Sequence, residues 1–448
     1  MTTFLIILET EVLVVASTAR SLLAHVLLFI RTLQSLKGEE ERAATSLSMP
    51  ATTAPRTART WAAAKAKDRL TPLEVELPPL GDNGVEISVT HCGLCGSDVH
   101  LINSDGGYAD FTAYALDKPQ VCGHEVIGTV TGVGSAIKHL KPGQRAGIGW
   151  QNAACHTCEW CKCGDEQLCS SVKCTCCEGN IGGFADYIRI EDGKFAFAIP
   201  DALDSAKTAP LLCGGQVSLA NSTHCPYMLL AHLFSLLHRI PLAARVSTQT
   251  VWTPLVQQSK EGDKVGILGL GGLGHMAVKF ASALGRNVTA LSGSMAKEQE
   301  AKALGAHAYV AHSDQAQLDA IAGTLDFILV TLATQEPVDF AKFFPLLRPR
   351  GTLCFVGMCP PITADVFTLG FTMNRITTSN TGGRKEMEQM LAFCAEHDIG
   401  ANVVTRPMSE VNECLAELET LKHAARFVLT NEIPPSPPTS PPGSLPPS

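Results

Sequence analysis

The stretch from Val265 to Gly274 constrains this chain most, because it reads as an apolar strand that runs directly into the pattern G-x-G-x-x-G. His275–Leu284 follows with the spacing of a helix, and Gly285 ends that helix. Glycines at these places allow a tight turn and let a pyrophosphate approach the helix N-terminus, where free N–H groups favour an anion. Strand, glycines and helix in this order predict a dinucleotide site. Its expected residues are Gly269, Gly271, Gly272, Leu273 and Gly274.

The segments after the glycine motif alternate between apolar runs and helical spacing. Strands are expected at Asn287–Leu291, Ala306–Ala311, Leu325–Leu332 and Gly351–Gly357, with a helix containing Phe340–Leu347 before the last of them. This alternation favours an α/β fold with a parallel sheet.

The end of the second strand lacks the acid that usually holds the ribose hydroxyls of NAD. A carboxylate about 4 Å from the extra phosphate of NADP would cost roughly 4 kcal/mol at an effective dielectric constant near 20, so its absence matters. The residues there can hydrogen-bond or neutralise that phosphate instead. They are Ser292, Gly293, Ser294 and Lys297. We therefore predict NADP(H), the alternative being a solvated loop lysine.

Four cysteines at the spacing C-x2-C-x2-C-x7-C are typical of thiolates around one zinc ion. Four thiolates fill a tetrahedral zinc, so this metal would be structural. Other cysteines lie nearby, so the sequence predicts that zinc is bound more firmly than it predicts which thiols bind it. They are Cys163, Cys174, Cys176 and Cys177. The spacing favours Cys155, Cys158, Cys161 and Cys169.

A second group of metal-binding residue types is scattered along the chain. Cys95 can bind zinc as a thiolate, and Asp98 can orient another ligand. Ser97 and His100 can pass a proton outward. With Cys95, two further residues would give three protein ligands: His124, which has Glu125 beside it, and Cys213. Each of these residues, taken alone, would be interpreted as structural. Three ligands leave one zinc position open, as a Lewis acid requires.

Composition agrees with a globular small-molecule enzyme. Hydrophobic residues make up 45% of the chain and charged residues 17%. The net charge of -8 argues against a nucleic-acid partner, which would need clustered Lys and Arg. Because the 17 cysteines include a zinc spacing rather than a disulfide framework, we expect a reducing compartment, the cytoplasm.

Both ends are expected to lie outside the core. Residues 1–49 contain two apolar runs, but Glu9, Glu11 and Arg20 interrupt them, so a membrane span is disfavoured and a poor anchor is the alternative. The resulting hypothesis is that Met49 is the working start. Residues 433–448 are almost entirely Pro, Ser, Thr and Gly, which predicts a disordered tail.

From about Thr60 to Glu432 the chain resembles the zinc-dependent medium-chain alcohol dehydrogenases, on the motifs GLCGSDVH, CGHE, APLLCGG, GLGGLG and SGSMAK and the four-cysteine lobe. More narrowly, it is similar to the cinnamyl alcohol dehydrogenase branch of NADP-dependent aldehyde reductases. The resemblance implies a GroES-like, β-rich catalytic domain, a doubly wound Rossmann domain and a homodimer.

The resemblance also implies roles for individual residues. Cys95, His124 and Cys213 would hold the catalytic zinc, with Glu125 and Asp98 nearby, while Ser97 and His100 would relay the proton. The nicotinamide side of the cleft would be lined by Ser379, Asn380, Thr381 and Gly382. Arg426 could reach the cofactor phosphates, the alternative being an ordinary surface arginine.

The expected domains are residues 50–213 for the catalytic domain with its zinc lobe at 151–169, 250–382 for the Rossmann domain, and 383–432 for the return to the catalytic domain. Family members run from the third ligand almost directly into a T-V-x-x-P-L helix, whereas residues 217–249 intervene here. Because Val codons begin with GT and a Gln codon can end in AG, we interpret this insertion as a retained in-frame intron, so that the working protein joins Gln216 to Thr250.

The function predicted is reversible hydride transfer between NADP(H) and a primary alcohol or aldehyde, aromatic or aliphatic. One alternative is an NAD-linked polyol or secondary-alcohol dehydrogenase, which the segment Ser292–Lys297 disfavours. Another is an inactive NADPH- and zinc-binding variant, because the insertion lies close to Cys213 in the sequence.

Overall fold

The computed structural model describes residues 56–105, 112–215, 251–332, 338–356, 362–379, 381–420 and 426–431. The predicted extension 1–49, insertion 217–249 and tail 433–448 lie outside these residues, as does Asn380. Within the described ranges, no helix is both long enough and apolar enough to cross a membrane.

A six-stranded parallel sheet carries the glycine motif. Its strands, in the spatial order β12-β11-β10-β13-β14-β15, are β10 (Lys264–Leu268), β11 (Asn287–Ser292), β12 (Ala308–Ala311), β13 (Leu325–Val330), β14 (Leu347–Phe355) and β15 (Arg375–Thr378). The strand order reverses between β10 and β13. In open parallel sheets, ligands bind outside the carboxyl ends of the strands at such a reversal.

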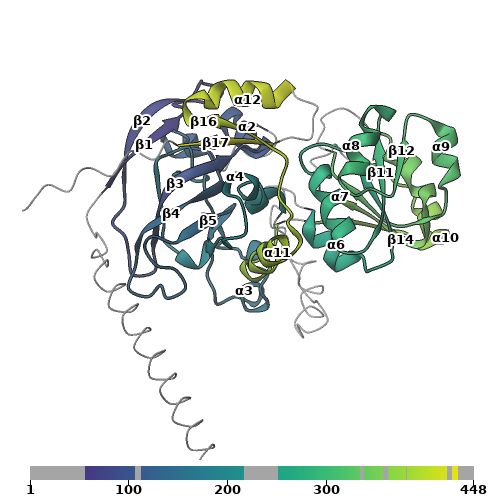
Figure 1. The fold of residues 1–448 in the computed structure, drawn as a ribbon, viewed down its shortest axis with the longest axis horizontal. Helices are drawn as coiled ribbons and strands as arrows, with labels where there is room; N and C mark the ends of the chain where they lie inside the picture. Colours follow the sequence, from purple (N-terminus) through teal and green to yellow (C-terminus); the bar gives the residue numbers. More distant parts are fainter. Residues whose placement is uncertain are drawn as a thin grey trace, which may run out of the picture. The chain divides into compact units, whose positions relative to one another are not determined.

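Helices cover both faces of this sheet, as a doubly wound fold requires. They are α6 (Trp252–Gln258), α7 (Gly274–Ala283), α8 (Glu298–Ala303), α9 (Gln315–Ala320) and α10 (Val366–Thr372). In Figure 1, α7 and α9 lie on opposite sides of the sheet. The helix expected around Phe340–Leu347 is a 3-10 helix over Phe340–Leu346, and it contains Pro345, which has no N–H for a helical hydrogen bond.

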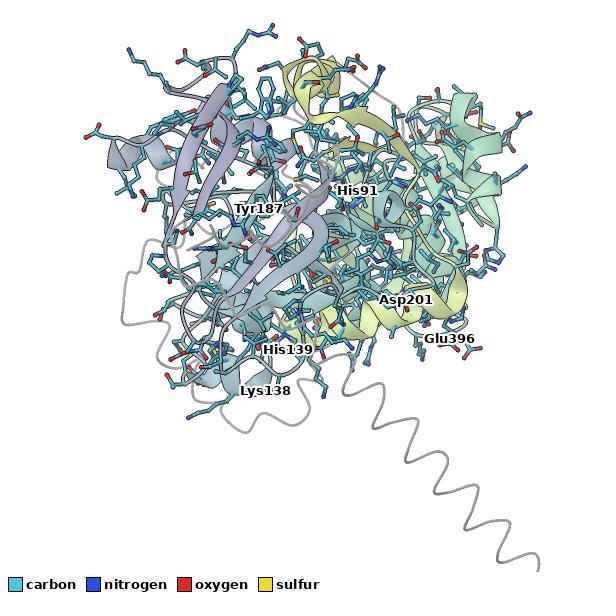
Figure 2. The ribbon with its side chains drawn as sticks, turned by 60° about the vertical axis from the view of Figure 1, so that its left-hand side comes forward. His91, Lys138, His139, Tyr187, Asp201 and Glu396 are labelled. Carbon is cyan, nitrogen blue, oxygen red and sulfur yellow. The ribbon has the colours of Figure 1, made fainter. Side chains whose placement is uncertain are left out.

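A seven-stranded sheet organises the β-rich part of the chain. Its strands, in the order β16-β17-β3-β4-β5-β9 with β8 paired to β3, are β3 (Val85–Gly93), β4 (Glu125–Val133), β5 (Arg145–Ile148), β8 (Tyr187–Ile190), β9 (Ala196–Ala198), β16 (Val403–Pro407) and β17 (Arg426–Thr430). β17 pairs antiparallel with β3, which brings a C-terminal segment beside the Cys95 stretch. His91 of β3 and Tyr187 of β8 are labelled in Figure 2.

Two small sheets and several helices complete the described chain. They are the hairpin β1 (Arg56–Ala62) and β2 (Thr71–Leu77), the pair β6 (Gln151–Ala153) and β7 (Lys173–Cys174), and the helices α2 (Gly96–Asn103), α3 (Glu159–Cys163), α4 (Ser205–Thr208), α11 (Arg384–His397) and α12 (Val411–Thr420). β8 begins only at Tyr187, after Gly182 and Gly183. The backbone N–H groups of Gly182 and Gly183 bond instead to carbonyls of the 121–123 segment.

Candidate active site

Four buried side chains that lie far apart in the sequence converge. One ligand atom from each of Cys95, His124, Glu125 and Cys213 lies within 4.8 Å of the others. Cys95 lies between β3 and α2, His124 and Glu125 lie at the start of β4, and Cys213 lies on a π-helical turn over Leu211–Gly215. We call these four residues the zinc-ligand group.

The spacing of the zinc-ligand group fits a tetrahedral zinc. Two thiolates, each about 2.3 Å from one zinc, lie roughly 3.8 Å apart in that geometry. The Cys95 and Cys213 sulfurs are 3.8 Å apart, and His124 Nε2 is 3.2 Å from the Cys213 sulfur. Glu125 Oε2 is buried without a hydrogen-bond partner in the described part of the chain, so a cation would also satisfy an oxygen atom that otherwise lacks a partner.

Asp98 fixes two members of the group. Its Oδ2 accepts a hydrogen bond from the backbone N–H of Cys95 (2.9 Å), which places the Cys95 thiol at the N-terminus of α2, where the helix dipole favours a thiolate. Its Oδ1 lies 3.1 Å from His124 Nδ1 and accepts from the Gly123 N–H at 2.9 Å. A proton on Nδ1 leaves Nε2 free to bind the metal.

Arg426 neutralises Glu125. Its guanidinium donates to Glu125 Oε1 and, at 3.1 Å, to the carbonyl of Leu94, and both members of the ion pair are buried. Burial raises the pKa of Glu125 to about 8 in spite of Arg426, so the carboxylate depends on the cations around it. The arginine is therefore buried and is not a surface residue. Its Cδ lies 2.9 Å from the place where a Cβ would stand on Gly272, within the glycine motif.

Ser97 and His100 lie on one face of α2, three residues apart. Ser97 is buried, and its Oγ is 3.6 Å from the Cys95 sulfur. The His100 side chain is 29% exposed, and its Nδ1 lies 2.6 Å from Asp105 Oδ1. The helix face thus leads from the zinc-ligand group to a titratable side chain in contact with solvent.

A second thiol cluster lies in the lobe after β6. The sulfurs of Cys155, Cys158, Cys161 and Cys169 are all within 4.8 Å of one another, and those of Cys155 and Cys161 are 3.9 Å apart. Backbone N–H groups of Thr157 and Cys158 approach the Cys155 sulfur. Hydrogen bonds, first from the Thr157 hydroxyl, lower the pKa of Cys155 to about 5, as suits a metal-bound thiolate. The exposed Cys163 lies outside the cluster.

The glycine motif forms the turn between β10 and α7. Gly269 has a φ of +99°, and a Cβ on Gly274 would stand 1.9 Å from the Gly269 carbonyl oxygen. Neither position tolerates a side chain, so the backbone can approach a pyrophosphate at the start of α7. Gly271 and Leu273 belong to the same turn, and Leu273 immediately precedes the helix.

The segment predicted to hold the extra phosphate begins where β11 ends. Ser292 is the last residue of that strand, and Gly293 and Ser294 follow it. Lys297 Nζ donates to the carbonyl of Leu270 at 2.7 Å, so this lysine lies against the glycine motif. Its place there is consistent with a role beside the dinucleotide.

The residues predicted for the nicotinamide side follow β15. Ser379 donates its backbone N–H to the carbonyl of Phe355 at the end of β14. Gln151 Nε2 donates to Thr381 Oγ1 at 3.2 Å and to the carbonyl of Gly382 at 2.9 Å. Asn380 lies outside the described residues.

Three contacts of the site were not predicted from the sequence. They are the ion pair of Arg426 with Glu125, the bonds of Gln151 to the 381–382 segment, and the approach of the Cys176 sulfur to His124 Nδ1 at 3.7 Å. The unusual cysteine-rich segment was the only signal for the last of these, and nothing local pointed to the other two.

Comparisons with known proteins give matches over most of the chain. Residues 81–201 match the alcohol dehydrogenase GroES-like domain, and residues 272–396 match the zinc-binding dehydrogenase domain. Aldehyde reductase AdhA of Synechocystis sp. is 32% identical over 83% of this chain and 98% of its own length. A cinnamyl alcohol dehydrogenase from Sorghum bicolor is 31% identical with a TM-score of 0.68, covering 84% of this chain and 98% of its own. The enzyme of the same name from Helicobacter pylori, solved with NADP(H), is 25% identical with a TM-score of 0.67 over 84% and 99%.

Proposed function

This chain belongs to the zinc-dependent alcohol dehydrogenases, and from that premise we propose that it transfers a hydride reversibly between NADP(H) and a primary alcohol or aldehyde. The observation that carries the proposal is the convergence of Cys95, His124 and Cys213 around one point. Three such ligands leave a fourth zinc position for the substrate oxygen, with Glu125, the fourth member of the zinc-ligand group, held beside the metal by its ion pair with Arg426.

The chain's own residues divide the work of the reaction. When bound, zinc supplies a Lewis acid for the carbonyl oxygen and NADPH supplies the hydride. Asp98 holds His124 in the tautomer that keeps Nε2 unprotonated. Ser97 donates the proton that the reduced substrate takes up, and His100 on the same helix face replaces it from solvent.

The preference for NADP(H) rests on the end of β11, which offers Ser292, Ser294 and Lys297 and no acid. Arg426, beside Gly272, is a further candidate contact for the cofactor phosphates. The segment 379–382 would line the nicotinamide, held by Gln151.

The test is the oxidation of NADPH and of NADH with aromatic and aliphatic aldehydes, with and without residues 217–249, on samples whose zinc content is measured. We expect NADPH to be preferred and two zinc ions per chain. Ser292→Asp should reverse the preference towards NADH, because its carboxylate repels the extra phosphate, while the uncharged Ser292→Asn is the matched control. An NADH preference in the unchanged chain, or a single zinc ion per chain, would refute the proposal.

We further propose that the protein is a cytoplasmic homodimer. On α10, Val366, Phe367 and Phe371 are 79%, 74% and 77% exposed, and β15 is the edge strand of its sheet. Exposed apolar side chains next to a sheet edge mark an interface. Phe371→Glu should yield monomers in sedimentation, whereas Leu116→Glu, at a residue that is 51% exposed, should leave a dimer intact. A monomeric unchanged chain would contradict this.

A further inference from the structure

A cavity of about 450 Å³ lies between β2, β6, β7 and β8. This volume is within the range of small-molecule pockets, about 300 to 1,000 Å³. Neither the zinc-ligand group nor the glycine motif contributes to its lining, so it is a site separate from the one above.

One wall of the cavity is apolar. Leu73, Val75 and Leu77 occupy alternate positions of β2, and successive strand residues point to opposite faces, so these three share a face. Leu73 is 38% exposed although it is large and apolar. This wall suits the apolar body of a ligand.

Some polar groups that line the cavity already have a partner, and others do not. Lys173 pairs with Glu191, and Arg189 pairs with Glu86. The Lys118 ammonium makes no ion pair with any residue that the structure describes. Asn152, only 8% exposed, has an Oδ1 without a hydrogen-bond partner in those same ranges. One cation and one amide are thus available to an incoming molecule, while Glu76, which alternates with Val75 and Leu77 along β2, also belongs to the lining.

We propose that this cavity binds a small carboxylic acid that has an apolar body and a hydroxyl group. The carboxylate pairs with Lys118, the body lies along Leu73, Val75 and Leu77, and the hydroxyl reaches the amide of Asn152. Such a ligand uses the free cation, the unpaired acceptor and the apolar wall together.

The cavity is connected through β6 to the segment 379–382, which is proposed to line the nicotinamide. Gln151 and Asn152 are adjacent on that strand, so their side chains point to opposite faces. The Asn152 side chain lines the cavity, whereas Gln151 bonds to Thr381 and Gly382. A ligand that moves Asn152 therefore shifts the bonds of Gln151, and bound acid is expected to change the KM for NADPH. Only this coupling rests on the proposed function.

The binding test is calorimetric titration of the full chain with sodium 4-hydroxybenzoate, with 4-hydroxybenzamide as the uncharged probe. We expect Lys118→Gln to weaken 4-hydroxybenzoate about fivefold, the upper range for a partly exposed ion pair, and Val75→Glu to abolish its binding by repulsion. The matched control is Lys138→Gln, a lysine whose side chain points outward in Figure 2 and does not line the cavity. Affinity in this control should be unchanged.

Equal affinity of the unchanged chain, Lys118→Gln and Val75→Glu would overturn the site, because the acid would then be bound elsewhere. Full zinc content and an unchanged thermal midpoint in the variants exclude misfolding as the cause of lost binding. Binding at the cavity with an unaltered KM for NADPH would overturn the coupling alone. Failure of NADPH turnover itself would reject the proposed function and leave the calorimetric result standing.

Discussion

Replacing Arg426 by Met isolates the charge of Glu125 inside the active site. The two side chains are 8% and 0% exposed, so water cannot take the place of the guanidinium. Removing one partner of a buried ion pair costs about 3 to 5 kcal/mol, because it leaves an uncompensated buried charge or forces the carboxyl to take up a proton. The lost hydrogen bond to the Leu94 carbonyl adds about 1 kcal/mol. We expect Arg426→Met to lower the free energy of unfolding by about 4 to 6 kcal/mol, the sum of these two contributions.

Urea unfolding of a double-mutant cycle measures this loss. Glu125→Gln removes the charge but keeps the shape, so Arg426→Met should cost much less in that background, with a coupling energy above about 1 kcal/mol. The control is Arg59→Met, because Arg59, whose side chain is 69% exposed, pairs with Asp186. Exposed pairs of this kind contribute less than about 1 kcal/mol. The reasoning is refuted if Arg426→Met is no more destabilising than Arg59→Met, or if the two active-site changes are simply additive.

Three further changes probe the site and its surroundings. Asp98→Asn should weaken zinc binding by about 10- to 100-fold in a chelator competition, because the amide has no charge and only one acceptor oxygen and so cannot serve both His124 and the Cys95 N–H; unchanged competition would contradict that role. Ser97→Ala should lower kcat about 100-fold with two zinc ions retained, and full activity would exclude the proton relay. Burial, and then the nearby Asp165 and Glu166, raise the pKa of Glu386 from 4.5 to about 9, so this carboxyl costs stability as pH rises from 4.5 towards 9. Glu386→Gln should therefore gain stability relative to the unchanged chain as pH rises, by up to about 3 kcal/mol at pH 7 and by little below pH 4.5, and a pH-independent difference in thermal unfolding would contradict this.

What the sequence reveals depends on how far apart the cooperating residues lie. The glycine motif could be predicted because strand, turn and helix are contiguous from Val265 to Leu284. The four-cysteine lobe could be predicted for the same reason, because all four thiols lie between Cys155 and Cys169. Cys213 is 118 residues from Cys95, and only the resemblance to a family joined them before the structure placed their sulfurs 3.8 Å apart.

The pairing of Arg426 with Glu125 could not be predicted, because it spans 301 residues and depends on strand register. β17 lies beside β3 with Val428 opposite Gly93, and β3 lies beside β4 with Gly93 opposite Glu125. No local pattern fixes these alignments. The structure also explains why residue 93 is glycine, which the sequence alone does not. A Cβ there would stand 2.0 Å from Glu125 Oε2.

Gly272 shows how the metal and dinucleotide regions constrain each other. It occupies a variable position of G-x-G-x-x-G, so the motif alone does not require glycine there. In the structure, a Cβ at this position would stand 2.9 Å from Arg426 Cδ, and Arg426 reaches from there to Glu125 in the zinc-ligand group. A side chain at residue 272 would displace the arginine and expose the charge of Glu125. Residue 272 is therefore glycine because Arg426 needs the space beside it in order to pair with Glu125 of the zinc-ligand group.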